Sequence, residues 1–282
     1  MMNRCVQLFA ITVLIAFGCR SNPATETSLK LYVFDCGRLN FDSIEPFFGI
    51  SDDETDVRDF VVPCYVIEHE KGRLLWEGGL PSDLTDIDGW KEMEGGWRMR
   101  LDKTFQEQIA EIGLSMSDFD YMSFSHFHFD HVGIANEVKG AKLIIQKREY
   151  EAAFADSVTA PGFSPELYTN LKEAEKIIIE GEYDVFGDGR VRLIPAPGHT
   201  LGHQVLYLDL PETGPIVLSG DLYVLRIGRE NRQILPIDVD STQSRESMNR
   251  IEAFLEKTGA ELWIGHELAH FNRLKKPPQY HH

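Results

Sequence analysis

The alternation of hydrophobic and polar positions predicts strands near the beginning of the chain. Leu29 to Asp35 alternates well enough for a first strand, and Phe60 to His69 and Arg73 to Glu77 are two further apolar runs around Glu70-Lys71-Gly72. A glycine between two such runs is typical of a tight hairpin turn, because it tolerates a positive φ. The pattern therefore predicts one strand followed by a hairpin.

The segment from Asp83 to Arg100 follows no clean period, and it carries Trp90 and Trp97 among glycines and charged residues. Such a segment is typical either of a loop that covers a substrate or of a surface loop anchored by its aromatic side chains. Both interpretations stay open. A helix is expected next, because Thr104 can cap a run with an apolar face that ends at Gly113.

Strands and helices alternate in the rest of the chain. The expected strands are Phe119 to Phe124, Lys142 to Gln146, Ile177 to Ile179, Val191 to Ile194, Gln204 to Leu210, Ile216 to Leu218 and Glu261 to Ile264. The expected helices are Val132 to Val138, Lys147 to Ala155 and a longer one from Ser241 to the stop at Gly259. This mixture predicts sheets that helices cover on the outside.

The stretch from Phe124 to His131 carries three imidazoles and a carboxylate within six positions, directly after a predicted strand. At the end of a strand, alternation places His126 and His128 on the same side. Asp130 and His131 can face the same cavity if the chain then turns. Three further donors, His199, Asp221 and His266, also stand just beyond predicted strands.

These seven residues are the donors expected for two divalent ions. One ion would be held by His126, His128 and His199, the other by Asp130, His131 and His266, with Asp221 bridging both. Imidazole and carboxylate ligation without thiolate suits zinc and also tolerates iron, manganese or cobalt. Seven donors around two ions leave positions for water and substrate, which favours a catalytic centre over a structural one. His203 is expected to support or pack against this centre rather than to bind metal.

His126-x-His128-x-Asp130-His131, followed by His199, Asp221 and His266, resembles the dinuclear metallo-β-lactamase superfamily. The resemblance covers about residues 29–276 and implies an α/β fold, an αβ/βα four-layer sandwich of two mixed β-sheets with helices outside. Within it, the chain looks most like the N-acyl homoserine lactonases. The stretches that carry this likeness are 31–37, 62–65, 125–131, 145–152, 179–183 and 196–203.

This resemblance implies that a metal-bridging hydroxide opens the ring of an N-acyl homoserine lactone or a related lactone. Asp130 would bind metal and give a proton to the departing alkoxide, and Tyr223 would hydrogen-bond the substrate, unless it is an ordinary packing tyrosine. Phe129 and the aromatic residues of 83–100 would line an acyl-chain groove. Many relatives have Asp-Thr-Gly where this chain has Glu77-Gly78-Gly79, so a rearranged loop is expected there.

Composition adds limits to this picture. The 282-residue chain is 43% hydrophobic and 26% charged, enough for one large domain with a full core. Its formal net charge of −17 argues against a nucleic-acid partner, because a surface that follows phosphates needs clustered Lys and Arg. The alternatives left open are another hydrolysis on the same centre (phosphodiester, thioester or β-lactam) and a non-catalytic metal-binding lipoprotein.

Residues 1–22 are predicted to be a leader outside the fold. Arg4 precedes an apolar run from Val6 to Gly18 that is too short to span a bilayer and suits a signal peptide. The run ends at Cys19 as in a bacterial lipobox, although Phe17 is bulky. A lipidated Cys19 would place the protein outside the cytoplasm as a membrane-anchored lipoprotein, in the periplasm or at the cell surface. A simple cleaved signal and an uncleaved anchor stay open.

Cys36 and Cys64 are the cysteines outside the predicted leader. An oxidising compartment would allow them to pair. Sequence does not tell whether they are close in space, and buried free thiols are the expectation.

Overall fold

The computed structural model describes residues 28–156, 158 and 161–282, so the predicted leader with Cys5 and Cys19 lies outside the described residues. The larger sheet has the strand order β4-β5-β1-β2-β3-β6-β7-β8. Its strands are β1 (Lys30–Phe41), β2 (Asp59–His69), β3 (Gly72–Trp76), β4 (Lys91–Met93), β5 (Trp97–Arg100), β6 (Tyr121–Ser123), β7 (Lys142–Gln146) and β8 (Lys176–Ile179). Antiparallel pairing from β4 to β3 changes to parallel pairing from β3 to β8.

The smaller sheet has the order β13-β12-β11-β10-β9 and is also mixed, because β12 and β13 are parallel and the other pairs antiparallel. Its strands are β9 (Tyr183–Asp184), β10 (Val191–Pro195), β11 (Gln204–Leu210), β12 (Gly214–Leu218) and β13 (Glu261–Trp263). Buried side chains of both sheets meet in one apolar cluster, with Val33, Leu74 and Trp76 from the larger sheet and Leu193 and Leu208 from the smaller one. The two sheets are therefore packed face to face.

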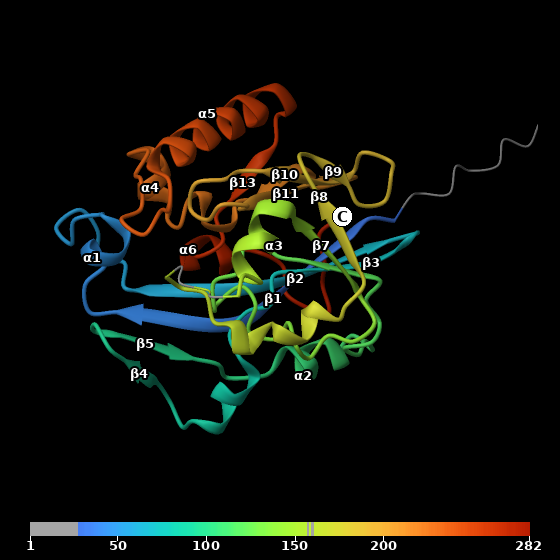
Figure 1. Cartoon of the computed structure of the whole chain (residues 1–282), viewed down its shortest axis with the longest axis horizontal. Helices are drawn as coiled ribbons and strands as arrows, with labels where there is room; N and C mark the ends of the chain where they lie inside the picture. The colour runs from blue at the N-terminus through green and yellow to red at the C-terminus, as the bar shows by residue number, and fades with distance from the viewer. Residues whose placement is uncertain (1–27, 157, 159–160) are drawn as a thin grey trace, which may run out of the picture.

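Helices cover the outer faces. The helices are α1 (Glu45–Phe48), α2 (Phe105–Ala110), α3 (Lys147–Ala153), α4 (Arg226–Glu230), α5 (Ser241–Thr258) and α6 (Leu268–Phe271), with 3₁₀ turns η1 (Ser82–Asp86), η2 (Pro165–Leu167), η3 (Thr169–Lys172) and η4 (Gly220–Leu222). Figure 1 shows α5 above the smaller sheet and α2 below the larger sheet. Met248 and Ile251 of α5 pack on Val205, while Phe105 of α2 packs on Phe34. The expected four-layer sandwich is confirmed.

Several local predictions were wrong. Part of segment 83–100 forms the β4–β5 hairpin, which joins the sheet because Arg100 to Trp97 pair with Arg38 to Phe41. Residues 132–138 form turns rather than a helix. Asp240, not Ser241, caps α5, since its side chain accepts the backbone N–H groups of Thr242 and Gln243.

The expectation of free thiols is corrected, because Cys36 and Cys64 form a disulfide between β1 and β2. The two strands run antiparallel and bring the cysteines within a Cα–Cα distance of 5.7 Å. Gly79 packs directly against the disulfide, and a Cβ on that residue would lie 2.3 Å from Cβ of Cys36. The disulfide therefore supports the glycine loop after β3.

The chain's last described residues belong to the fold beyond the predicted limit of 276. The backbone N–H of Leu31 donates to the carbonyl of His281, and the N–H of His281 donates back to Leu31. Within the described residues, no helix is both long and apolar enough to cross a bilayer.

Candidate metal centre

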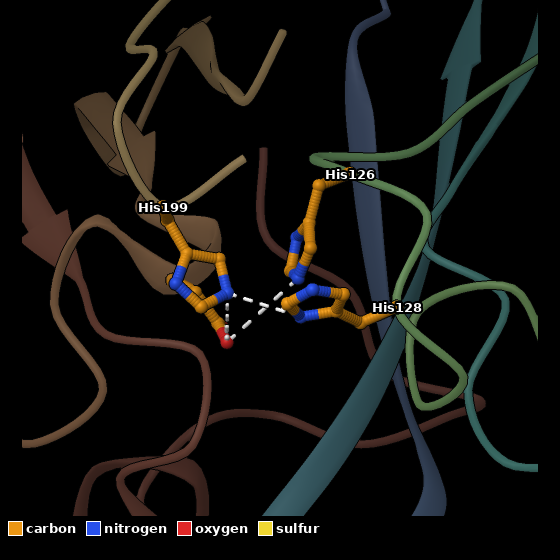
Figure 2. Close-up of side chains that lie close together, drawn as sticks. His126, His128 and His199 are labelled. Carbon is orange, nitrogen blue, oxygen red and sulfur yellow. Dashed lines mark hydrogen bonds and ion pairs between the residues drawn. The ribbon is translucent and has the colours of Figure 1, made fainter. Parts of the chain in front are cut away.

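Four of the predicted donors form a first buried group. His126, His128, His199 and Asp221 present ligand atoms that all lie within 4.8 Å of one another. Figure 2 shows the three imidazoles turned toward a common point, with His126 and His128 from one loop and His199 from the opposite side. Nε2 of His199 lies 3.1 Å from Nδ1 of His128 and 3.4 Å from Oδ2 of Asp221.

The other three donors, Asp130, His131 and His266, form a second buried group. Asp221 stands between the groups. Its Oδ2 faces the first, and its Oδ1 lies 3.1 Å from Nε2 of His266 and 3.3 Å from Nε2 of His131. The structure therefore brings all seven residues together, with Asp221 in the bridging place expected of it. Their binding of metal stays a prediction that this convergence supports.

Strand ends explain the convergence. The His126 loop follows β6 of the larger sheet, while His199, Asp221 and His266 follow β10, β12 and β13 of the smaller sheet. Because the two sheets pack face to face, loops from both meet at one edge. The donors thus come from both halves of the sandwich.

Buried hydrogen-bonding groups orient the rings. The Oγ atom of Ser125 lies 2.9 Å from Nδ1 of His126, and Oδ1 of Asp238 lies 3.0 Å from Nδ1 of His199. The carbonyl of Val61 lies 2.7 Å from Nδ1 of His266. In metal sites such partners fix which ring nitrogen is free to bind the ion. Here they leave Nε2 of each ring directed to the interior of the centre.

The Glu77-Gly78-Gly79 loop takes part in this support. Oε2 of Glu77 lies 3.2 Å from Nδ1 of His131 and accepts the backbone N–H of Ser125 at 3.2 Å. The residue is strained, with a positive φ of 66°. Neither Glu77 nor Asp238 was predicted to be a partner of the donors. For Glu77, the available signal was the aspartate that many relatives have at this position. For Asp238, the sequence held no signal.

Electrostatics differ between the two groups. Burial, with the neighbouring His131, holds the pKa of His126 well below its ordinary value, and burial with His199 does the same for His128. Both rings are therefore neutral near pH 7, the form that binds metal. Against the opposing effect of burial, Glu77 and neighbouring carboxylates raise the pKa of His131 well above its ordinary value.

The residues present fit two divalent cations. Within the part of the chain that the structure describes, Nε2 of His126 is buried without a hydrogen-bond partner. Nε2 of His131 lies beside two carboxylates, 3.3 Å from Oδ1 of Asp221 and 3.8 Å from Oδ2 of Asp130. Buried polar atoms are otherwise paired in folded proteins, so an unpaired nitrogen directed at a cluster of donors suits a bound cation. The pKa of Asp221 is held well below its ordinary value, because His266 and His131 outweigh its burial. Its carboxylate is therefore ionised as a bridging ligand requires.

His203 supports the centre, as the sequence analysis expected. Its Nε2 accepts the backbone N–H of Asp221 at 3.0 Å, while its Nδ1 lies 3.0 Å from the carbonyl of Ala196. Burial, and then the nearby His199, lower the pKa of His203 to about 3. The ring is neutral and fixes the backbone of the bridging residue.

Tyr223 is not among the residues that line the cavity next to the donors. It lies in the apolar cluster between the smaller sheet and α5, with Met248 and Phe254 as neighbours. Burial, and then the carboxylate of Glu252, raise the pKa of its phenol, so the hydroxyl is on the side of α5. The adjacent residue Val224 lines the cavity in its place. The position of Tyr223 fits the packing alternative and gives no support to contact with substrate.

A cavity of about 250 Å³ opens from the two groups of donors. Its polar lining consists of His128, Asp130, Asp221 and His266. The remaining lining is apolar and mainly aromatic: Leu39, Phe41, Phe47, Phe48, Phe60, Trp97, Phe129, Pro161, Gly162, Val224 and Ile237. Trp97 and Phe129 line it as the sequence predicted, whereas Trp90 lies against Arg98 and Arg100 instead. The phenylalanines of β1 and α1 were not predicted.

Comparison with known proteins places this geometry among known folds. Residues 57–266 match the model of the metallo-beta-lactamase superfamily. An N-acyl homoserine lactonase, AttM, of Azorhizobium caulinodans is 30% identical over 273 residues, which cover 90% of this chain and 99% of that protein. An N-acyl homoserine lactonase of a Bacillus species is 28% identical, with 90% of this chain and 99% of that protein covered.

Solved structures agree with the sequence matches. A structure of N-acyl homoserine lactone hydrolase, with the product N-hexanoyl-L-homoserine at its catalytic metal centre, superposes with a TM-score of 0.74 at 25% identity. The superposition covers 89% of this chain and 98% of the other. An AiiA variant of Bacillus thuringiensis with N-decanoyl-L-homoserine at its active site also gives a TM-score of 0.74 at 25% identity, covering 89% and 98% of the two chains.

Proposed function

The chain belongs to the metallo-β-lactamase superfamily, and from this premise we propose that it is a metal-dependent hydrolase that opens N-acyl homoserine lactones or closely related lactones. The observation that carries the proposal is the meeting of two groups of donors at Asp221, at the polar end of an otherwise aromatic cavity. A lactone with an apolar tail matches both ends of that cavity. The alignment of this chain with the two relatives named lactonases covers 99% of the length of each relative.

The residues around the cavity have separable roles in this proposal. The seven donors would hold two divalent ions, and these would lower the pKa of water and polarise a carbonyl group. Asp130 lies at the cavity surface, with Oδ2 3.7 Å from Nε2 of His266. From there its carboxyl group can hold a proton and deliver it to the alkoxide that leaves when the ring opens. Tyr223 packs in the cluster with residues of α5, and the side chain of Val224 has no polar atom, so the proposal assigns neither residue a hydrogen bond to the substrate.

The aromatic lining selects the tail of the substrate. Phe41 contacts Phe48 and Trp97 in this lining. Trp97 also contacts Phe129, which stands between His128 and Asp130 in the chain. Burying an apolar chain here removes it from water at about 0.8 kcal/mol for each CH₂ group. The proposed substrates are therefore lactones with an unbranched acyl chain rather than the short, polar lactones.

Zinc is the metal that we propose for both positions. Five imidazoles and two carboxylates without thiolate suit Zn²⁺, and iron, manganese and cobalt bind the same donor types. Elemental analysis of protein purified without added metal tests this proposal. If the protein holds fewer than two equivalents of zinc and another transition metal makes up the difference, that metal and not zinc would be assigned to the remaining position.

We also propose that the chain acts outside the cytoplasm on a lipid tether at Cys19. The support is the lipobox-like end of the leader and the Cys36–Cys64 disulfide, since disulfides persist in oxidising compartments. Labelling cells with a fatty-acid analogue tests the tether. Wild-type protein should carry the label in the membrane fraction, and Cys19→Ala should not. Unlabelled wild-type protein would reject the tether.

A substrate panel tests the hydrolase. N-acyl homoserine lactones from butanoyl to dodecanoyl should be hydrolysed, whereas nitrocefin and bis-(p-nitrophenyl) phosphate should react slowly or not at all. His128→Ala is the matched inactive control, because it removes one donor of the first group. If the protein hydrolyses these lactones no faster than buffer does, the proposed lactonase activity is rejected. Equal inactivity of wild type and His128→Ala on every ester would leave a non-catalytic metal-binding protein.

A further inference from the structure

A buried carboxylate outside both groups of donors connects the loops that carry them. Glu149 is in the first turn of α3, only 2% exposed, and is not a member of either group. All three of its hydrogen-bond donors belong to loops of the metal centre. Neither the expected ligand set nor the proposed chemistry uses this residue.

The Oε1 atom of Glu149 accepts the backbone N–H of Phe127 at 3.0 Å. Phe127 stands between His126 and His128, so this bond fixes the backbone from which both imidazoles project. The loop belongs to the larger sheet, because it follows β6. Glu149 thus holds one side of the first group of donors.

The Oε2 atom of Glu149 reaches the other side. It accepts the hydroxyl of Thr200 at 2.7 Å and the backbone N–H of Gly202 at 2.8 Å. Thr200 directly follows His199, in the loop between β10 and β11 of the smaller sheet. A Cβ on Gly202 would lie 2.4 Å from the backbone nitrogen of Glu149, so a glycine is what allows this close approach.

We propose that Glu149 is a positioning residue that sets the distance between the His126–His128 loop and the His199 loop, and thereby organises the first group of donors before a cation binds. One carboxylate joins two loops that belong to different sheets and that meet at Nδ1 of His128 and Nε2 of His199, 3.1 Å apart. Partners that orient ligands typically contribute 10–100-fold to metal affinity. The inference rests on the proposed function only for the presence of a metal centre.

The experiment measures zinc affinity of the full chain after metal has been removed, by competition with a chromophoric chelator. Glu149→Gln keeps the shape of the side chain but turns one acceptor oxygen into a donor that faces N–H or O–H groups. Its affinity for one of two zinc ions should fall by about 10–100-fold. Glu151→Gln, on the exposed side of the same helix, is the matched control and should keep both affinities.

A purely structural role is separated by comparing melting temperatures with and without zinc. Loss of general stability lowers both temperatures equally and leaves their difference unchanged. Loss of positioning reduces the difference. An unchanged difference and unchanged zinc affinity in Glu149→Gln would overturn the inference.

Thr200 keeps the test decisive if Glu149→Gln does not fold. Thr200→Val removes a single hydroxyl from the network and should lower the affinity for the same ion, while Thr200→Ser keeps the hydroxyl and should restore it. Equal affinity in all three proteins would also overturn the inference. Because zinc binding is the readout, wild-type protein that binds zinc but opens no lactone would reject the proposed function alone.

Discussion

The side chain of Asp221 lies between two sets of imidazoles, with Oδ2 toward His199 and Oδ1 toward His266. Its backbone is held by His203, whose own ring is held by a carbonyl. At the scale of single residues, the candidate metal centre is therefore a set of seven donors whose directions are fixed by neighbours outside that set. Asp238 and Glu77 act on His199 and His131 in this way.

Asp238→Asn should weaken zinc binding at the first group by about 10–100-fold, because His199 loses a charged partner at Nδ1. The variant keeps nearly the same volume, so the fold should be retained. Chelator competition measures the affinity, and Asp209→Asn, at an exposed position of β11, is the control. An affinity equal to that of the control would show that Asp238 does not orient His199.

Among the secondary-structure elements, the β4–β5 hairpin contributes to the cavity, although its sequence pattern did not predict a hairpin. It pairs with β1 and brings Trp97 to the cavity, next to Phe41 and Phe129. The residues of this hairpin show no clear alternation, since its strands are only three and four residues long and β4 is at the edge of the sheet. The pairing of β5 with β1 is what joins this hairpin to the larger sheet.

The aromatic wall predicts a dependence on acyl-chain length. Each added CH₂ group should raise kcat/KM by up to about fourfold, from about 0.8 kcal/mol per CH₂, until the cavity is full. Trp97→Ala should flatten this dependence and leave butanoyl homoserine lactone nearly unaffected. Steady-state kinetics over the series give the slope. A slope that is equal in wild type and Trp97→Ala would exclude Trp97 from tail binding.

The strand pair β1–β2 is cross-linked by its disulfide across 28 positions of sequence. Loop-closure entropy predicts that losing a cross-link of this length costs about 3–4 kcal/mol. Cys36→Ala/Cys64→Ala should therefore be less stable than wild type by about that amount in urea denaturation. Reduced wild type should show a similar loss. A difference below about 1 kcal/mol between oxidised and reduced wild type would contradict this prediction.

The C-terminal segment that pairs with β1 should make stability depend on pH. Burial, and then Lys275 and Lys276, lower the pKa of His281 to about 4, and its Nε2 accepts the backbone N–H of Lys275 at 3.1 Å. An unfolded histidine has a pKa of about 6.5. Between these values the unfolded chain binds a proton that the folded chain does not, so stability falls as the pH is lowered from about 6.5 to about 4.

His281→Gln should make this fall shallower, because glutamine takes up no proton. Urea denaturation at several pH values measures the change, and His282→Gln removes an imidazole from the neighbouring position as a control. Equal flattening in both variants would show that His281 is not the source.

At the scale of the whole molecule, the metal centre joins the two sheets. His126, His128, Asp130 and His131 follow the larger sheet, and the other three donors follow the smaller one. A cation bound by both sets links the halves of the sandwich and stabilises the folded chain by mass action. His131 is buried beside Glu77, Asp130 and Asp221, and these carboxylates raise its pKa against the opposing effect of burial.

Removing metal should lower the melting temperature strongly. Free zinc at 1,000 times its dissociation constant stabilises by about 4 kcal/mol, which corresponds to a shift of about 8–16 °C in a chain of this size. Calorimetry before and after chelation, and after zinc is restored, measures the shift and its reversal. His266→Ala should show a smaller shift than wild type. A melting temperature unaffected by chelation would show that metal does not link the halves.

From the sequence alone we predict seven donors and their order along the chain, and the structure brings these seven residues together. The alternation expected at the end of a strand predicts His126 and His128 on one side, although both lie in the loop after β6. His199, Asp221 and His266 stand just beyond strands, where loops meet in layered folds. These are local properties, so a pattern of residues is enough to find them. The same holds for strands such as β2 and β11, whose apolar runs are long.

The residues that support the donors, and most of those that line the cavity, became known from the folded chain. The disulfide, the contacts of Glu149, and the reach of Asp238 to His199 join positions far apart in sequence. Tyr223 and Val224 are neighbours in the chain, but Tyr223 packs in the cluster with residues of α5, whereas Val224 lines the cavity. Side-chain direction at such positions depends on which distant segments pack together, and no local pattern records that.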